Sequence, residues 1–187
     1  MNSALVVPAP APFSIPRGAR LTANVKSLLE QCDSALLALT DFRKEYPMTV
    51  PPDRMMDDAL ADMKQVGVQA LLVTHDDLDE DDHRVLGLIT QYDIERKNPH
   101  RFPGGPPRPL NCLKVLDVMT TWTELSLVRY DSLIDLTVGD LFERFQGSGL
   151  THLLVIETRI DDTAVARGLI SRAALAMALR RQGATWS

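Results

Sequence analysis

Gly87, Thr90 and Asp93 stand at fixed spacing in the segment GLITQYD over residues 87–93. An apolar strand is predicted to end here and a helix to begin, so the free N–H groups at the helix start attract an anion such as phosphate. Thr90 adds a hydroxyl that donates and accepts, and the Asp93 carboxylate can accept both hydroxyls of a ribose. The same Thr-x-x-Asp pair is also a capping box, which needs no ligand. The motif alone leaves both interpretations open.

A second copy of this motif, GLISRAA over residues 168–174, keeps the glycine and the hydroxyl of Ser171 but has Ala174 in place of the acid. Ser171 can still cap a helix, whereas recognition of a ribose needs the carboxylate. The comparison therefore predicts two unequal sites, with ribose held more tightly beside Asp93.

The two motifs belong to a longer duplication. The segment GVQALLV that begins at Gly67 returns as GLTHLLV at Gly149, 82 positions later, and the glycine motif returns 81 positions later. A repeat of this length is too long for a solenoid unit. It indicates two small α/β units of the same kind.

Each unit is predicted to run strand, helix, strand, strand, helix. In the first unit, residues 48–50 form a short strand, and Asp53 caps a helix whose apolar residues share one face. Gly67 ends that helix as its left-handed cap. Strands over 69–74 and 84–90 follow, and then a helix over residues 91–97, which ends before Pro99.

The second unit repeats this order. Its first strand is predicted at 127–129, displaced by an insertion of four residues, and its last helix at 175–181. Asp135 matches the cap Asp53. The apolar face of the first helix returns 82 positions later as Val138, Leu141, Phe142 and Phe145.

The flanking segments have a different composition. Residues 1–18 contain four prolines and are predicted to form a flexible or weakly docked arm. An amphipathic pattern over 21–42 predicts one or two short helices. The predicted boundaries are thus 1–46 for the arm and short helices, 47–98 for the first repeat, 99–114 for a Pro/Gly-rich linker and 115–187 for the second repeat.

Composition restricts the class of protein. The chain has 187 residues, of which 45% are hydrophobic, enough to fill a core without disulfides, and its formal net charge is -5. The charge and the lack of a basic stripe argue against nucleic acid or an anionic membrane as partner. No 18 consecutive apolar residues occur, and Cys32 and Cys112 have neither metal-ligand nor disulfide spacing. We expect a cytoplasmic protein without a membrane segment.

The duplicated strand-helix-strand-strand-helix order, with a Gly-apolar-apolar-Thr/Ser turn into each last helix, resembles a tandem pair of CBS domains, the Bateman module. The resemblance implies an α/β fold with two CBS repeats related by a pseudo-two-fold axis, their small sheets packed together and helices outside. It also implies a regulatory module that binds AMP, ADP, ATP or S-adenosylmethionine in clefts between the repeats. No chemistry on the ligand is implied.

In this family the residues that open the central strand also face the ligand. The ligand-binding residues that the resemblance implies here are Thr49, Gln69, Ala70, Thr90, Asp93, Thr151, His152 and Ser171. A histidine ring can donate to a phosphate, so His152 is a candidate contact, although a lone histidine at a strand start is also compatible with a partly buried surface residue. Thr49 is equally compatible with a β-branched strand residue.

We predict no enzyme and no metal site. The acidic run over residues 76–82 lacks the central glycine and bidentate glutamate of a calcium loop, the histidines form no i, i+4 pair, and no nucleophile motif occurs. The family resemblance implies a homodimer, but an apolar helix stripe also suits a monomer. With no effector domain in this sequence, signalling must reach a separate, unknown protein. The alternative is a ligand-free scaffold for protein interaction.

Overall fold

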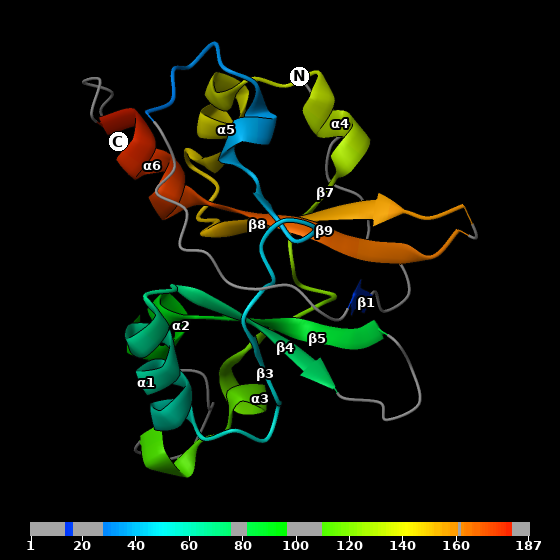
Figure 1. Cartoon of the computed structure of the whole chain (residues 1–187). Helices are drawn as coiled ribbons and strands as arrows, with labels where there is room; N and C mark the ends of the chain where they lie inside the picture. Colours follow the sequence, from blue (N-terminus) through cyan, green and yellow to red (C-terminus); the bar gives the residue numbers. More distant parts are fainter. Residues whose placement is uncertain (1–13, 17–27, 76–81, 97–109, 161, 181–187) are drawn as a thin grey trace. The chain divides into compact units, whose positions relative to one another are not determined.

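The computed structural model describes residues 14–16, 28–75, 82–96, 110–160 and 162–180 (Figure 1). The predicted acidic hairpin connection, the prolines of the linker and the start of the predicted arm lie outside these ranges. Strand β1 (Ser14–Pro16) pairs antiparallel with β5, so the end of the predicted arm is a strand.

The first repeat has the predicted order of elements. It consists of β3 (Thr49–Val50), α1 (Met56–Val66), β4 (Ala70–His75), β5 (Asp82–Thr90) and α2 (Gln91–Arg96). Strand β3 is parallel to β4, and β4 is antiparallel to β5. Helix α1 ends at Gly67, whose φ of 77° is the left-handed conformation predicted for this cap.

The second repeat has the same order with one added helix. Its elements are β7 (Leu127–Arg129), α4 (Tyr130–Ile134), α5 (Val138–Phe145), β8 (His152–Thr158), β9 (Ala164–Ser171) and α6 (Arg172–Arg180). The short helix α4 follows β7 directly, and it accounts for the insertion seen in the sequence. The pairing of the strands matches that of the first repeat.

A short segment precedes each repeat in the chain, and we call the two the lead segments. The first contains the 3-10 helix η2 (Ala35–Ala38) and strand β2 (Thr40–Asp41). The second contains η3 (Leu110–Cys112), helix α3 (Val115–Val118) and strand β6 (Thr120–Thr121). Strand β2 pairs with β9 of the second repeat, and β6 pairs with β5 of the first.

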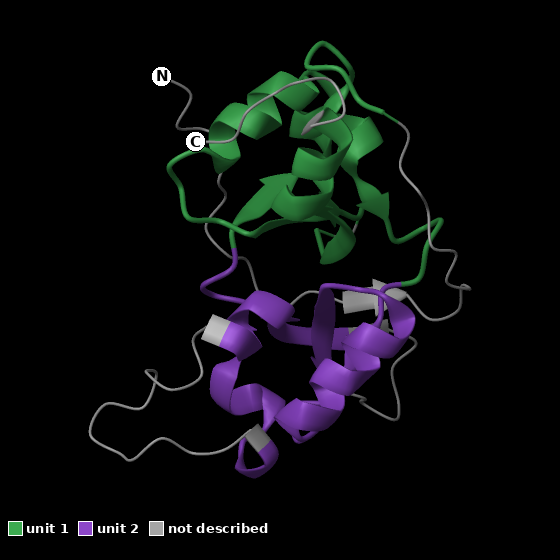
Figure 2. Ribbon diagram, turned by 90° about the vertical axis from the view of Figure 1, so that its left-hand side faces the viewer, with its two compact units in different colours: residues 1–13, 18–46, 126–187 green, residues 14–17, 47–125 purple. Residues whose placement is uncertain are grey.

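The two compact units therefore do not follow the order of the chain. Of the described residues, those up to 46 after β1 group with those from 126 onward, and β1 groups with residues between 47 and 125 (Figure 2). The predicted boundaries, 47–98 and 115–187, follow the repeats in sequence and do not contain this exchange of lead segments. Each unit has its own hydrophobic core.

The lead segments are part of these cores. Leu29, Ala35 and Ala38 are buried in the same cluster as the apolar residues of α5 and β8. Leu113 and Val115 are equally buried in the cluster of α1, β4 and β5. Burial of one such side chain stabilises a fold by roughly 1.5–3 kcal/mol, so each repeat depends on the other repeat's lead segment.

The apolar pattern of 21–42 corresponds to a helix only in part. Within its described part, the structure contains one short helix, the four residues of η2, followed by the two residues of strand β2. Ala35, Ala38 and Leu39 are buried in the core of this unit. The spacing that predicted a helix stripe is satisfied by one tight turn followed by an extended strand.

Two predicted helix caps are also wrong. Helix α1 begins after Met55, whose side chain makes no capping hydrogen bond, and Asp53 lies before it. Asp135 lies at the end of α4, while α5 is capped by Thr137 and Asp140. The hydroxyl of Thr137 accepts from the Asp140 N–H at 3.2 Å, and an Asp140 carboxylate oxygen accepts from the Thr137 N–H at 2.7 Å. The Thr137 hydroxyl also donates to this oxygen at 2.7 Å, and the two bonds that the carboxylate accepts lower the pKa of Asp140.

Candidate functional site

The first repeat brings four of its five predicted site residues to one end of its sheet. Ala70, the first residue of β4, pairs with Thr90, the last residue of β5. The N–H of Gln91 donates to the carbonyl of Gln69 at 3.0 Å. Helix α2 starts directly after Thr90, which carries Asp93 to the same strand end.

Thr90 and Asp93 form a complete capping box. The Thr90 hydroxyl donates to Asp93 Oδ2 at 2.6 Å, the Thr90 N–H donates to the same oxygen at 3.2 Å, and the Asp93 N–H donates to Thr90 Oγ1 at 3.1 Å. Thr90 is 2% exposed and Asp93 is 4% exposed. The capping interpretation is therefore realised in the structure, whatever else these two side chains bind.

Thr49 is one strand away from this cluster. It pairs with Leu72, two residues along β4 from Ala70, and is half-buried. Since side chains alternate along a strand, Thr49 and Ala70 share one face of the sheet. Leu71 and Val73, on the opposite face, belong to the core beneath the helices. Thr49 thus lies on the helix-free face but not beside the helix start.

The second repeat repeats this junction with fewer polar contacts. His152 pairs with Ser171, and the Arg172 N–H donates to the carbonyl of Thr151 at 2.9 Å. The His152 ring Nδ1 and the Thr151 hydroxyl are 3.1 Å apart. Ser171 Oγ accepts from the N–H of Ala174 at 3.4 Å, a long contact compared with the box of the first repeat. Thr151, His152 and Ser171 are all half-buried.

The glycine of each motif has a structural reason that is independent of any ligand. A Cβ on Gly168 would lie 2.4 Å from the carbonyl oxygen of Thr40, and a Cβ on Gly87 would lie 2.4 Å from that of Thr120. At these points β2 pairs with β9, and β6 pairs with β5. Glycine is required because the lead strands pass too close for any other side chain.

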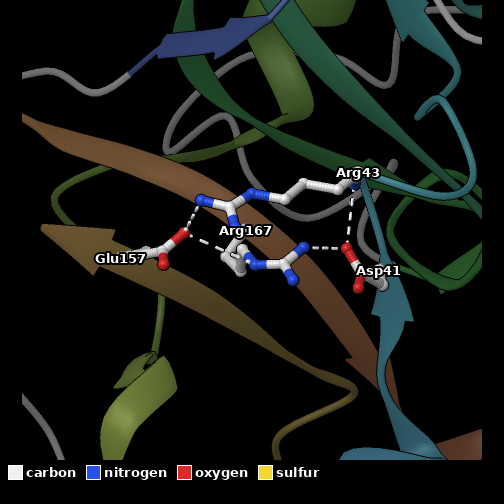
Figure 3. Close-up of polar contacts among 4 residues, drawn as sticks. All are labelled: Asp41, Arg43, Glu157 and Arg167. Atoms are coloured by element: carbon white, nitrogen blue, oxygen red, sulfur yellow. Dashed lines mark hydrogen bonds and ion pairs between the residues drawn. The ribbon is translucent and has the colours of Figure 1, made fainter. Parts of the chain in front are cut away.

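A cluster of four charged residues was missed by the sequence analysis. Arg167 of β9 donates to Asp41 of β2, and its Nε lies 3.4 Å from Glu157 Oε2 of β8 (Figure 3). Arg43 donates to the same Glu157 oxygen at 2.6 Å, and its backbone N–H donates to Asp41 Oδ1 at 2.9 Å. The Arg167 guanidinium also stacks over the Tyr130 ring, 4.8 Å from its centroid.

Two side chains of this cluster, those of Arg167 and Asp41, have unusually little exposure for charged residues. The side chains of Arg167 and Asp41 are 8% and 13% exposed, while that of Arg43 is 61% exposed. Loss of hydration lowers the pKa of the Arg167 guanidinium. The partners are too far apart in sequence for spacing rules to join them. One feature of the sequence could have indicated the cluster. Arg167 lies in an otherwise apolar strand, and its equivalent in the first repeat is Leu86.

The structure also bears on the predicted absences. Within the described ranges, no helix has the length and apolar character needed to cross a membrane. Among the same residues, no three side chains of His, Cys, Asp or Glu gather in a way that could hold a metal ion. Cys32 and Cys112 are both exposed free thiols.

Comparison with known proteins identifies the fold. The model of the CBS domain family matches residues 39–98. The structure is similar to an uncharacterized conserved protein from Pyrococcus horikoshii, with 19% identity, a TM-score of 0.51, and coverage of 85% of this chain and 98% of that one. A CBS-domain containing protein from Agrobacterium tumefaciens matches with 22% identity and a TM-score of 0.50, over 73% of this chain and 87% of that one. No curated protein sequence matches.

Proposed function

We propose that the chain is a tandem CBS pair that acts as a regulatory module for an adenosine-containing ligand, because the CBS family model matches residues 39–98 and the fold is similar to that of a CBS-domain containing protein. The ligand class is AMP, ADP, ATP or S-adenosylmethionine. Binding shifts the balance between two conformations of the module, and a separate effector protein responds to this shift. The ligand is bound and released unchanged. We also propose that the protein works in the cytoplasm as a homodimer.

The junction of β4, β5 and α2 is the observation that carries this proposal. It brings residue Gln69, the hydroxyl of Thr90 and the carboxylate of Asp93 to one end of the sheet. A carboxylate that already accepts from a hydroxyl at 2.6 Å is suited to accept from ribose hydroxyls instead. Ligand binding would then exchange the Thr90 hydroxyl for the ribose hydroxyls as donors to Asp93. Thr49 would contact the ligand from the neighbouring strand.

The second junction supports a weaker site. It offers the half-buried hydroxyls of Thr151 and Ser171 and the ring of His152, but Ala174 supplies no carboxylate. We propose that this junction contributes a phosphate contact through His152 rather than a ribose contact. One clear binding event per chain, or two with separated affinities, is the expected stoichiometry.

A second function deserves a test because the capping box is complete without a ligand. Asp93 accepts from both the backbone and the side chain of Thr90, and it is almost fully buried. These contacts would account for Asp93 as a helix cap even if no ligand bound there. A scaffold that uses the CBS fold only to present surfaces to other proteins is therefore the competing proposal.

A thermal-shift panel distinguishes the two functions. Nucleotide carried through purification is removed first, and the four candidate ligands are then added at millimolar concentration. A ligand at one hundred times its Kd stabilises the folded state by about 2.7 kcal/mol, which corresponds to about 5–10 °C in Tm at this chain length. The matched control is 2′,3′-dideoxyadenosine monophosphate, which lacks the ribose hydroxyls and should shift Tm much less. Shifts below one degree for all four ligands would favour the scaffold.

A further inference from the structure

The two lead segments fit almost identical sites on the two sheets. Thr40 pairs with Leu169, and Thr120 pairs with Leu88. The backbone carbonyl oxygen of each threonine lies against the motif glycine, 2.4 Å from where a Cβ on that glycine would be. The apolar pattern also returns 80 positions later. Matching pairs are Ala35 and Val115, Ala38 and Val118, Leu39 and Met119, and Phe42 and Trp122.

A β-bulge completes this equivalence. The register shifts between Val73 and Thr74 on β4 and at the equivalent place between Val155 and Ile156 on β8. Opposite these shifts, Leu86 and Arg167 are the extra residues of their strands. The N–H of Trp122 donates to the carbonyl of Leu86 at 2.9 Å, and the N–H of Phe42 donates to that of Arg167 at 2.9 Å. The backbone therefore offers each lead segment the same hydrogen bonds on either sheet.

Side-chain charge is where the two sites differ. In the first repeat, the bulge residue is Leu86, and the lead strand places Thr121 opposite Gly87. In the second repeat, the bulge residue is Arg167, and the lead strand places Asp41 opposite Gly168. The fold does not need this charge, because the first repeat makes the same backbone contacts with uncharged side chains.

Exchanging the two lead segments would separate the charges. Arg167 would lie beside Thr121, and Asp41 would lie beside Leu86. A charge buried without its partner is strongly unfavourable, whereas a buried ion pair adds little net stability compared with apolar residues. Buried ionic groups are instead known to specify the register and the partner of packed elements.

We propose that the Asp41–Arg167 ion pair selects which lead segment occupies which sheet. It directs residues 35–42 onto β9 and keeps the homologous residues 115–122 off that strand, in the same molecule and in neighbouring copies. Glu157 and the Tyr130 ring hold the Arg167 side chain in place, since they contact its Nε and its guanidinium plane. Arg43 holds Glu157 from the solvent side.

Disulfide trapping tests this selection in the full chain with Cys32 and Cys112 replaced by serine. The pair Thr40→Cys and Leu169→Cys reports the native pairing of β2 with β9. The pair Thr120→Cys and Leu169→Cys reports the exchanged pairing of β6 with β9. Non-reducing gels score cross-links within and between chains after mild oxidation.

The native pair should cross-link in the otherwise unchanged chain, and the exchanged pair should not. Replacing Asp41 by Thr and Arg167 by Leu gives both sites the residues of the first repeat and removes the charge difference. The exchanged cross-link should then rise at least tenfold. An unchanged exchanged cross-link, in a protein where the native pair still forms, would overturn the proposal.

A second variant keeps every residue of the ion cluster and does not depend on how well the double variant folds. Thr121→Asp gives the second lead segment a carboxylate able to pair with Arg167, and it should also raise the exchanged cross-link. Thr121→Asn is the matched control of nearly equal size without charge, and it should not. Equal cross-linking in the Asp and Asn variants would show that charge does not select the segment.

Discussion

Replacing Arg167 by leucine, the residue at the equivalent place in the first repeat, should lower the free energy of unfolding markedly. The change removes the guanidinium that pairs with Asp41 and Glu157 and stacks on Tyr130. The Asp41 side chain, 13% exposed in the native structure, then loses the one side-chain cation that pairs with it among the described residues. Arg43 contacts Asp41 through its backbone N–H, while its side chain binds Glu157. The site therefore keeps a buried negative charge that the native fold had compensated.

The magnitude follows from the burial of the two partners. Breaking a buried ion pair by removing one partner costs about 3–5 kcal/mol. We expect about 3 kcal/mol, the lower end, because Glu157 keeps its contact with Arg43 and is 24% exposed. The double variant Asp41→Thr, Arg167→Leu has no buried charge left and carries the residues of the first repeat. It should unfold within about 1 kcal/mol of the native protein.

Urea denaturation followed by circular dichroism measures both variants, together with Asp41→Thr alone. The three free energies form a double-mutant cycle with an expected coupling of at least about 2 kcal/mol. Arg43→Ala is the control, since its side chain is 61% exposed and its loss should cost less than about 1 kcal/mol. A double variant destabilised by the sum of the two single variants would refute the reasoning, because the ion pair would then contribute no coupling.

Two further predictions concern the lead strands and a helix cap. Gly168→Ala and Gly87→Ala should each lower the free energy of unfolding by about 2–3 kcal/mol in thermal or urea unfolding, because the new Cβ meets a strand carbonyl at 2.4 Å. Gly147→Ala, with a φ of 69° and open space around it, should cost only about 1 kcal/mol, and equal losses at all three positions would contradict this account. Asp140→Asn should flatten the acid limb of the stability curve, which a pH titration of unfolding measures. The Thr137 bonds lower the pKa of Asp140 in the folded state. The contribution of Asp140 to stability is therefore present above the ordinary aspartate pKa of about 3.9 and is lost as pH falls below it. An unchanged acid limb would show that these bonds do not persist in solution.

The sequence made the repeats predictable because their signals are local. The apolar runs of the central strands, the left-handed cap at Gly67 and the spacing of Thr90 and Asp93 each depend on neighbours within a few residues. The duplication then added a second instance of each signal. Strand order in both repeats, and the helices other than α4, follow from these patterns.

One of the errors missed a local signal, and the others have physical causes that lie outside the local pattern. Asp135 was preferred as a cap, although Thr137 and Asp140 form a capping box that the sequence also contains. Residues 21–42 were predicted to be one or two short helices because burial against a distant strand produces the same apolar spacing as one helix face. The pairing of Asp41 with Arg167 joins residues 126 positions apart, and only the fold brings them together.

Asp93 tests the proposed function most directly, because the ligand-binding and capping roles assign it different energies. As a cap alone, it contributes about 0.5–1 kcal/mol to stability. As a ribose acceptor, it contributes about 1.5–3 kcal/mol to binding, so Asp93→Ala should weaken the Kd about 10- to 150-fold. The variant should fold, since Ala174 occupies the equivalent position of the second repeat.

The measurement is titration calorimetry of the native protein and of Asp93→Ala with the adenosine ligand that shifts Tm most. Ser171→Ala, at the junction without a carboxylate, is the matched control and should leave the tighter binding event unchanged. The account predicts a large loss of affinity for Asp93→Ala with only a small loss of thermal stability. A variant that loses stability but keeps its Kd would contradict the account and leave Asp93 as a helix cap.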